Sequence, residues 1–403
     1  MFLKRNLILI LMAFIVFSGL LVRYLDRVPD RHYCDFRVYY KAGQDFIRGK
    51  NIYFRETQET TPFKYSPFFA FVFAPLSLLP IKASAAVFFT INFCLTILFF
   101  RLSFHLVQGS SLAKIFSDRE SLLIYVLAVL FSLRYIFLVG DSGQVNILMC
   151  TLILAALTFL SKGREGLAGA FLAAAILIKY TPVIFLPYLL YQRKFKTVLW
   201  AILFVGLFLI VPALVVGFSK NLFYLSAWGP SIITTSLDHF SYIDSKNQSI
   251  FSMFLRFLSP TSYNVHIFFF SFDDALNFGR IAAVILYLAV FIPGKLKPRD
   301  MVIDSAVLMI CMSLFNPNGW VLSFVSLGLP CMLLIQYLFA IKGKDRFVLF
   351  LLITTFILTN IMSRDLLGKG AEAFGCAYSF TTLGGLLIYM ALLKLKFSKI
   401  LRF

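Results

Sequence analysis

Residues 167–191 read LAGAFLAAAILI-KYTP-VIFLPYLLY, and this stretch decides how the rest of the chain is interpreted. It is as long and as apolar as a membrane span, but Lys179 and Pro182 interrupt it. The two arms have about 12 and 9 residues, or about 18 and 13 Å of helix, so neither crosses a hydrocarbon core of about 30 Å. Basic residues bound the stretch on both sides. We therefore predict a re-entrant pair of short helices whose turn lines a cavity that opens outward.

The composition is that of an integral membrane protein. Apolar residues make up 60% of the 403 residues and charged residues only 14%, a balance that a water-soluble globule of this size does not need. An apolar run follows Lys4 and Arg5 but lacks a small-residue cleavage site, so we expect a retained span rather than a signal peptide. The six cysteines show neither zinc-site nor disulfide spacing.

Apolar segments of sufficient length predict ten spans. They are Leu7–Val22, Ser84–Phe104, Ser121–Val139, Val145–Leu160, Thr197–Gly217, Asn277–Ile292, Met301–Phe315, Trp320–Ala340, Phe347–Met362 and Ala377–Leu393. With the re-entrant pair they give twelve helices that penetrate the membrane. Ser66–Leu79 contains Pro67 and Pro75, so we expect it to be a re-entrant or surface-lying helix on the outer face.

This arrangement concentrates Lys and Arg in the turns on the cytoplasmic side, which is the positive-inside pattern, and it places both termini in the cytoplasm. The fold class that we predict is an all-α polytopic membrane protein with one domain over residues 1–403. Two long loops lie on the outer face, at 23–83 and 218–276. The first contains interfacial helices.

Polar side chains in or beside the apolar segments gather on the predicted outer face. Asp35 follows the first span, and from position alone it is either a site carboxylate or an exposed carboxylate paired with Arg31, Arg37 or Lys41. Lys179 places an ammonium group at a turn inside the bilayer, which is costly and marks a site, often one for an anion. Snorkelling of Lys179 to the surface is the alternative.

Amides and further cations accompany these two residues. The tight turn at Gly143-Gln144-Val145-Asn146, the run Asn247-Gln248-Ser249 and the turn at Asn316–Trp320 all face outward in the predicted topology. Turn formation and helix capping are simpler explanations for each of them alone. Taken together, one carboxylate, several amides and a group of cations indicate a lipid that carries phosphate and is reached from outside.

Short motifs also follow one another in a specific order. They are Asp35-Phe36 with Tyr39-Tyr40, Gly49-Lys50-Asn51-Ile52-Tyr53, Tyr65-Ser66-Pro67 with Pro75-Leu76 and Leu79-Pro80, Gly143–Asn146, Gly169 through Lys179 to Pro182, and Asn247-Gln248-Ser249 with Arg256. Their order resembles that of the polyprenol-phosphate-dependent glycosyltransferases of family 87, in the C-type membrane glycosyltransferase superfamily. The resemblance covers almost the whole chain.

The resemblance implies inverting transfer of a hexose, with mannose expected, from a polyprenyl-phosphate donor to an acceptor hydroxyl. It implies an active site on the outer face of a bacterial plasma membrane. Asp35 would be the general base, because a departing phosphate needs no second, acidic carboxyl group. Lys179 and Arg256 would hold that phosphate, with Arg134 and Arg364 in reserve. The expected contacts to sugar or acceptor come from Tyr39, Tyr40, Gln144, Asn146, Asn247, Gln248 and Asn318.

The partners that the resemblance implies are the lipid-linked sugar, membrane lipids, and a glycolipid, glycan or protein acceptor, without nucleic acid. No cofactor is expected, and no metal, since Asp273-Asp274 is better explained as solvated surface. Two other functions stay open: a lipid-linked sugar transporter or flippase, and a non-catalytic glycolipid-assembly protein. Internal repeats typical of transporters are not evident, and a non-catalytic protein would have no use for Asp35.

Overall fold

The computed structural model describes residues 17–27, 35–53, 62–109, 112–236, 242–263, 265–294 and 300–398. In these ranges the chain is helical apart from turns and an isolated bridge between Asn247 and Trp320, so the predicted all-α class is confirmed. The first elements are α2 (Asp35–Ile47), α3 (Pro67–Ser77), α4 (Ile81–Gln108), α5 (Leu112–Ser117), α6 (Arg119–Ser142), α7 (Asn146–Ser161), α8 (Glu165–Ile178), η1 (Thr181–Ile184), α9 (Phe185–Tyr191), α10 (Phe195–Ile210) and α11 (Ala213–Val216).

The second half continues in the same manner. Its elements are α12 (Phe218–Ser236), α14 (Ile250–Leu258), α15 (Phe272–Leu288), η2 (Ala289–Phe291), α16 (Asp300–Leu314), η3 (Val321–Leu327), α17 (Gly328–Ala340), α18 (Arg346–Phe356), η4 (Ile357–Ile361), α19 (Arg364–Ala377) and α20 (Phe380–Phe397). The predicted outer loop 218–276 therefore contains α12, α14 and the start of α15.

Six segments of the described chain are long and apolar enough to cross a membrane. They are Ile81–Gln108, Arg119–Ser142, Phe195–Val216, Phe272–Phe291, Val321–Ala340 and Phe380–Phe397. A seventh arises if Arg346–Ile361 and Arg364–Ala377, which meet at a bend of 95°, form one span. The protein is thus a multi-pass membrane protein.

The expectation of twelve penetrating helices is not confirmed, because several predicted spans correspond to helices that are too short for a straight crossing. α7 has 16 residues and α16 has 15, which is below the length of about 20 that a straight crossing needs. Most of the predicted first span, Leu7–Val22, lies outside the described residues. Residues 17–27 are described and are helical.

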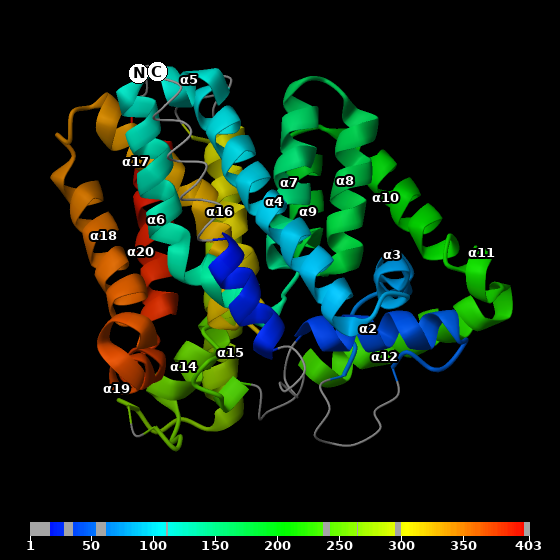
Figure 1. Cartoon of the computed structure of the whole chain (residues 1–403). Coiled ribbons are helices and arrows are strands. Elements are labelled where there is room, and N and C mark those ends of the chain that lie inside the picture. Colours follow the sequence, from blue (N-terminus) through cyan, green and yellow to red (C-terminus); the bar gives the residue numbers. More distant parts are fainter. Residues whose placement is uncertain are drawn as a thin grey trace.

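The interruption in residues 167–191 lies where the sequence places it. α8 ends at Ile178, and Lys179 is extended with φ −143° and ψ 134°. η1 then begins at Thr181, with Pro182 as its second residue, and leads into α9. In Figure 1, α8 runs toward the end that carries α2 and α3, and α9 returns toward the opposite end. α8 packs very closely on α10, since a Cβ added to Gly169 would lie 2.7 Å from the nitrogen of Ala201.

The two ends of the molecule differ in construction. At one end α2 and α12 lie across the direction of the long helices, with α3 beside them (Figure 1). α3 has only 11 residues and begins at Pro67, with the Ser66 hydroxyl accepting the backbone N–H of Phe69 as a cap. This agrees with the expectation of a short helix in Ser66–Leu79. The opposite end carries the end of α20 and the turns that precede α10 and α18 (Figure 1).

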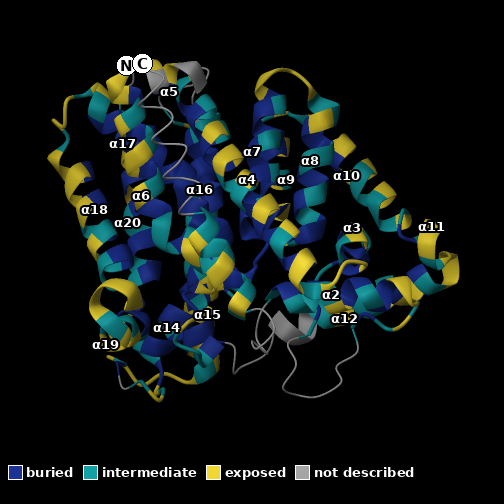
Figure 2. Ribbon diagram, in the orientation of Figure 1, coloured by how far each residue is buried: buried dark blue, intermediate teal, exposed yellow. Residues whose placement is uncertain are grey.

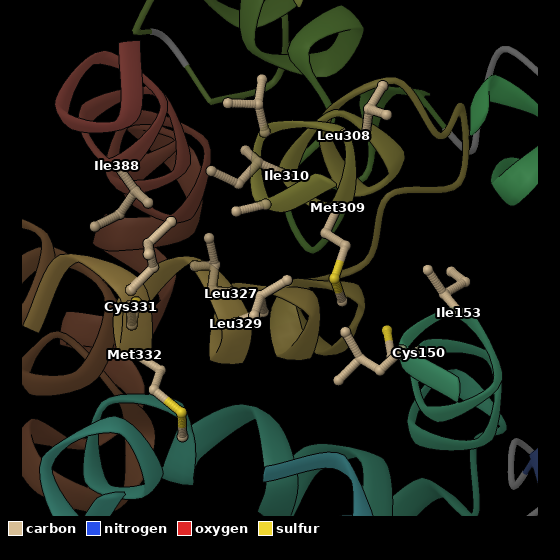
Figure 3. Close-up of a cluster of buried hydrophobic side chains, with 14 of the residues drawn as sticks. Cys150, Ile153, Leu308, Met309, Ile310, Leu327, Leu329, Cys331, Met332 and Ile388 are labelled. Carbon is tan, nitrogen blue, oxygen red and sulfur yellow. The ribbon is translucent and has the colours of Figure 1, made fainter. Parts of the chain in front are cut away.

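The core lies between helices that are far apart in sequence. Figure 3 shows Cys150 and Ile153 of α7 facing Met309 of α16, with Leu329 of α17 and Ile388 of α20 completing the cluster. Large apolar side chains on α10 and α18 are exposed instead (Figure 2), as expected for helices that face lipid.

A buried ion pair closes the core near the end of α20. Lys396 is 1% exposed, and its ammonium lies 2.6 Å from an Asp304 carboxylate oxygen on α16. Lys396 also donates to the carbonyl of Val290, and the Tyr188 hydroxyl donates to Asp304 at 3.0 Å. One pair of charges therefore joins α20, α16, η2 and α9.

Candidate functional site

Asp35 is the first residue of α2, a helix whose buried face carries Phe36, Tyr39 and Phe46 at helical spacing. This face packs on α3, where a Cβ at Gly43 would overlap the Ser77 side chain, so only glycine allows the two helices to come this close. The amphipathic pattern of α2 thus fixes the position of Asp35 at the helix start, at the end of the molecule where α8 is interrupted (Figure 1).

A glycine turn brings a second segment against Asp35. Gly143 ends α6 with φ +64°, a left-handed conformation that favours glycine. A Cβ at Gly143 would lie 2.7 Å from the Cβ of Phe36 and 2.5 Å from the Tyr24 hydroxyl. The turn therefore needs glycine for both its conformation and its contact, and it carries Gln144 and Asn146 to the start of α2.

The surroundings of Asp35 alter its acidity. Burial raises the pKa of the Asp35 carboxyl group to about 6, and three neighbours limit the rise: the charge of Lys179, a hydrogen bond from Gln144 and the charge of Lys64. Desolvation disfavours the carboxylate, whereas nearby cations and donors favour it. The carboxyl group is thereby suited to accept a proton near neutral pH.

The Gln144 side chain is enclosed by hydroxyl groups. Its Oε1 accepts from the Tyr39 hydroxyl at 2.9 Å, the Tyr65 hydroxyl at 3.3 Å and the backbone N–H of Val145 at 3.0 Å. The hydroxyls of Tyr39 and Tyr65 also lie 2.8 Å apart. Gln144 and Tyr39 are buried, so the structure places these two predicted sugar contacts inside the wall of the site.

Lys179 reaches toward the same turn. Its ammonium donates to Oδ1 of Asn146, the first residue of α7, and its charge acts on Asp35. Ser66 holds this region together, because its hydroxyl donates to the carbonyl of Leu177 at 2.6 Å while it caps α3. The structure therefore brings together four residues that the sequence singled out: Asp35, Gln144, Asn146 and Lys179.

Two participants were missed as site residues. Lys64 acts on the charge of Asp35, and Tyr65 contacts Gln144. Tyr65 begins the motif Tyr65-Ser66-Pro67 and Lys64 precedes it, but the sequence analysis assigned neither residue a role. Their participation depends on the packing of α3 beside α2 and the turn after α6, which no local pattern in the sequence reports.

Arg256 belongs to a second cluster. It is fully buried, and its guanidinium donates to the Ser379 hydroxyl at 2.8 Å and to the carbonyl of Asn247 at 2.9 Å. Asn247 Nδ2 donates to the carbonyl of Pro317, and the Gln248 side chain donates to the carbonyl of Cys376. These contacts tie α14 to the turn before η3 and to α19. Contact of Arg256, Asn247 or Gln248 with substrate stays a prediction.

The remaining predicted residues are dispersed. Arg134 on α6 donates to the carbonyl of Thr359 and pairs with Glu372 of α19 at 3.8 Å, whereas Arg364 is exposed at the start of α19. The Tyr40 hydroxyl donates to the carbonyl of Leu79. Asn318 is half-buried in the turn after α16. Substrate roles for these four also stay predictions.

One link joins the two clusters. The hydroxyl of Tyr180, directly after Lys179, donates to Oδ1 of Asn316 at 3.4 Å. A cavity of about 580 Å³ lies elsewhere, beside Lys342, Lys344 and Lys394 near the end of α20, and so does not include Asp35. Among the described residues, no three His, Cys, Asp or Glu side chains lie close enough to hold a metal ion.

Comparison with known proteins adds the family. The model of glycosyltransferase family 87 matches residues 63–323, a region that contains Gln144, Asn146, Lys179 and Arg256, while Asp35 precedes it. No curated protein matches the chain. A match over more than half of the sequence, in a chain with six or seven candidate spans, decides the assignment. The protein is a membrane-embedded glycosyltransferase and belongs to glycosyltransferase family 87.

Proposed function

We propose that the protein transfers a hexose, with mannose expected, from a polyprenyl-phosphate carrier to an acceptor hydroxyl, with inversion at the anomeric carbon. One observation carries the proposal: Asp35, half-buried at the start of α2, shares one region with Lys179 from a distant part of the chain, whose ammonium donates to Asn146 and whose charge acts on the Asp35 carboxyl group. An inverting transfer from a lipid phosphate needs one base and one phosphate-binding cation, and this pair supplies both.

The reaction follows from the two charges. Asp35 takes the proton of the acceptor hydroxyl while the acceptor oxygen attacks the anomeric carbon. The bond between that carbon and the phosphate oxygen breaks, and the phosphate leaves with the bonding electrons. Lys179 stabilises the negative charge that grows on the phosphate, an interaction that is strengthened where water is excluded. Proton transfer to a placed base contributes about 10²- to 10⁴-fold to such a rate.

The proposed orientation places this site on the outer face of the membrane. The basic turns before α10 and α18 lie at the end opposite to α2 and α3 (Figure 1), and such turns are typical of the cytoplasmic side. A carrier lipid would enter from the outer leaflet, and the acceptor would be a glycolipid, a glycan or a protein.

Asp35→Asn tests the base. We expect sugar transfer to fall about 10²- to 10⁴-fold while polyprenyl phosphate still binds. Asp45→Asn is the matched control, because Asp45 is also buried on α2 and also has a lysine neighbour, Lys41, at 3.6 Å. Transfer that persists undiminished in Asp35→Asn would rule out this base. Movement of the lipid-linked sugar across vesicles without any glycoside product would favour a flippase instead.

A further inference from the structure

Two side-chain amides, one residue apart, flank the proposed site in the same turn. Gln144 ends the glycine turn after α6, and Asn146 begins α7. Gln144 is 8% exposed and Asn146 only 1%. In both amides the oxygen is occupied by donors from the protein, which leaves the nitrogen of each to be explained.

The orientation of the Gln144 amide follows from one contact. A backbone N–H can only donate, so the atom that lies 3.0 Å from the nitrogen of Val145 is the amide oxygen. The hydroxyls of Tyr39 and Tyr65 also lie within hydrogen-bond distance of this oxygen. The Nε2 group is thus turned away from these donors, and a hydrogen bond from the Gln144 side chain is one of the interactions that lower the pKa of Asp35.

The orientation of the Asn146 amide follows in the same way. An ammonium can only donate, so the atom that Lys179 contacts is Oδ1. Nδ2 of Asn146 is buried and has no hydrogen-bond partner among the described residues. Leaving a buried amide donor without a partner costs about 1–3 kcal/mol. A bound ligand can supply the missing acceptor, as can an ordered water.

This unpaired donor lies at the positive end of a helix. α7 has 16 residues, and its first backbone bond runs from the nitrogen of Met149 to the carbonyl of Val145. The N–H groups of Asn146, Ile147 and Leu148 therefore precede the first bond within the helix, and the helix dipole favours an anion beside them. Nδ2 of Asn146, the ammonium of Lys179 and the N–H groups at the start of α7 are therefore the donors that this region offers to an oxyanion.

We propose that the two amides have separate tasks: Gln144 is a positioning residue that holds the Asp35 carboxylate, and Asn146 binds the phosphate of the lipid-linked donor together with Lys179 and the N-terminus of α7. This inference rests on the proposed function and deepens it. Lys179 connects the two tasks, since it contacts Asn146 and its charge acts on Asp35. The segment from Gln144 to Asn146 thereby sets the position of the base relative to that of the leaving phosphate.

Asn146→Asp tests the phosphate site, because it preserves the acceptor for Lys179 and replaces the donor Nδ2 with a negatively charged oxygen. Asn277→Asp is the matched control: Asn277 also accepts from a cation, Arg280, at 2.8 Å, but it is exposed on α15. The probes are a short-chain polyprenyl phosphate and the uncharged polyprenol in detergent micelles. We expect Asn146→Asp to weaken phosphate binding at least about tenfold, or about 1.4 kcal/mol, and Asn277→Asp to leave it unchanged.

The outcomes separate this site from the function on which it rests. Wild-type protein that binds polyprenyl phosphate no better than polyprenol would refute the proposed donor, and with it the site. Selective binding in wild type that Asn146→Asp leaves intact would refute the site alone.

Gln144→Leu tests the positioning role, with Gln192→Leu as control because Gln192 also hydrogen-bonds a tyrosine hydroxyl but lies at the end of α9. The charged and titratable groups that act on Asp35 are Lys179, Lys64 and Tyr65, and Gln144→Leu leaves all three in place. We expect the acid limb of kcat/KM to move up by about one pH unit, since a donor to the carboxylate is lost.

A second variant guards against misfolding. Gln144→Glu keeps an oxygen for Tyr39 and Tyr65 but turns another oxygen toward Asp35, so it should move the same limb in the same direction by charge repulsion. Polyprenyl phosphate should bind both variants within about threefold of wild type. An unmoved acid limb in folded Gln144→Glu would overturn the positioning role, as would loss of transfer accompanied by equal loss of phosphate binding.

Discussion

Sugar transfer should depend on pH through the Asp35 carboxyl group. Burial raises the pKa of this group to about 6, and only the ionised form can accept the proton of the acceptor hydroxyl. The ionised fraction is therefore about nine-tenths at pH 7 and about one-tenth at pH 5, so kcat/KM should fall about tenfold between these values. The sign is fixed by the role: activity rises with pH through the folded-state pKa and then levels off.

The assay is initial-rate transfer of a radiolabelled hexose from polyprenyl phosphate to an acceptor in detergent or nanodiscs. Rates at each pH are compared with those after return to pH 7, so that irreversible unfolding is separated from titration. Lys64→Gln provides an internal check, because the charge of Lys64 lowers the pKa of Asp35, and its removal should shift the curve to higher pH. A rate that is constant from pH 5 to 7.5, or that decreases as the pH rises, would contradict the role of Asp35 as base.

Three further predictions concern stability and geometry. Because the folded-state pKa of Asp35 is raised, ionisation of this group opposes folding above about pH 6. Asp35→Asn should therefore stabilise the protein above about pH 6 by at most about 3 kcal/mol, and should have no such effect below about pH 4. Thermal unfolding at both pH values measures the difference. Gly143→Ala should cost about 1 kcal/mol in backbone strain plus about 1–3 kcal/mol from overlap with neighbouring atoms, and it should reduce transfer. Gly163→Ala, at φ +71° with open space around it, should show only the cost of the strain in the same unfolding assay. Lys396→Met should destabilise the fold by about 3–5 kcal/mol in denaturant unfolding, because it leaves the Asp304 carboxylate unpaired. Adding Asp304→Asn should recover much of this lost stability. If the two changes were fully additive, the result would argue against the ion pair.

The sequence predicts the helices better than the number of crossings. Apolar length locates α4, α6 and α20 within a few residues, and the proline-flanked lysine marks the end of α8. The predicted spans Val145–Leu160 and Met301–Phe315 also match α7 and α16 closely, but these helices have only 16 and 15 residues. Counting every apolar segment of this length as a span therefore overestimates the number of crossings.

The candidate site is predictable in part, for a related reason. Asp35 and Lys179 can be selected from the sequence because they are ionisable residues in or beside apolar segments, where a charged group is costly and marks a functional site. The same reasoning selects Arg256, which is more fully buried than either but donates to carbonyl groups and Ser379. Sequence alone does not distinguish a side chain that faces a ligand from one that holds the backbone. The family resemblance assigns Gln144 to the sugar, and the contacts of Gln144 with Tyr39 and Tyr65 become visible only in the folded chain.

The Ser66 hydroxyl has a consequence for how α3 and Lys179 are coupled. It bonds the carbonyl of Leu177 and caps α3, so a short helix at one end of the molecule is fastened to the residues just before Lys179. A displacement of α3 would therefore be passed on to the backbone just before Lys179.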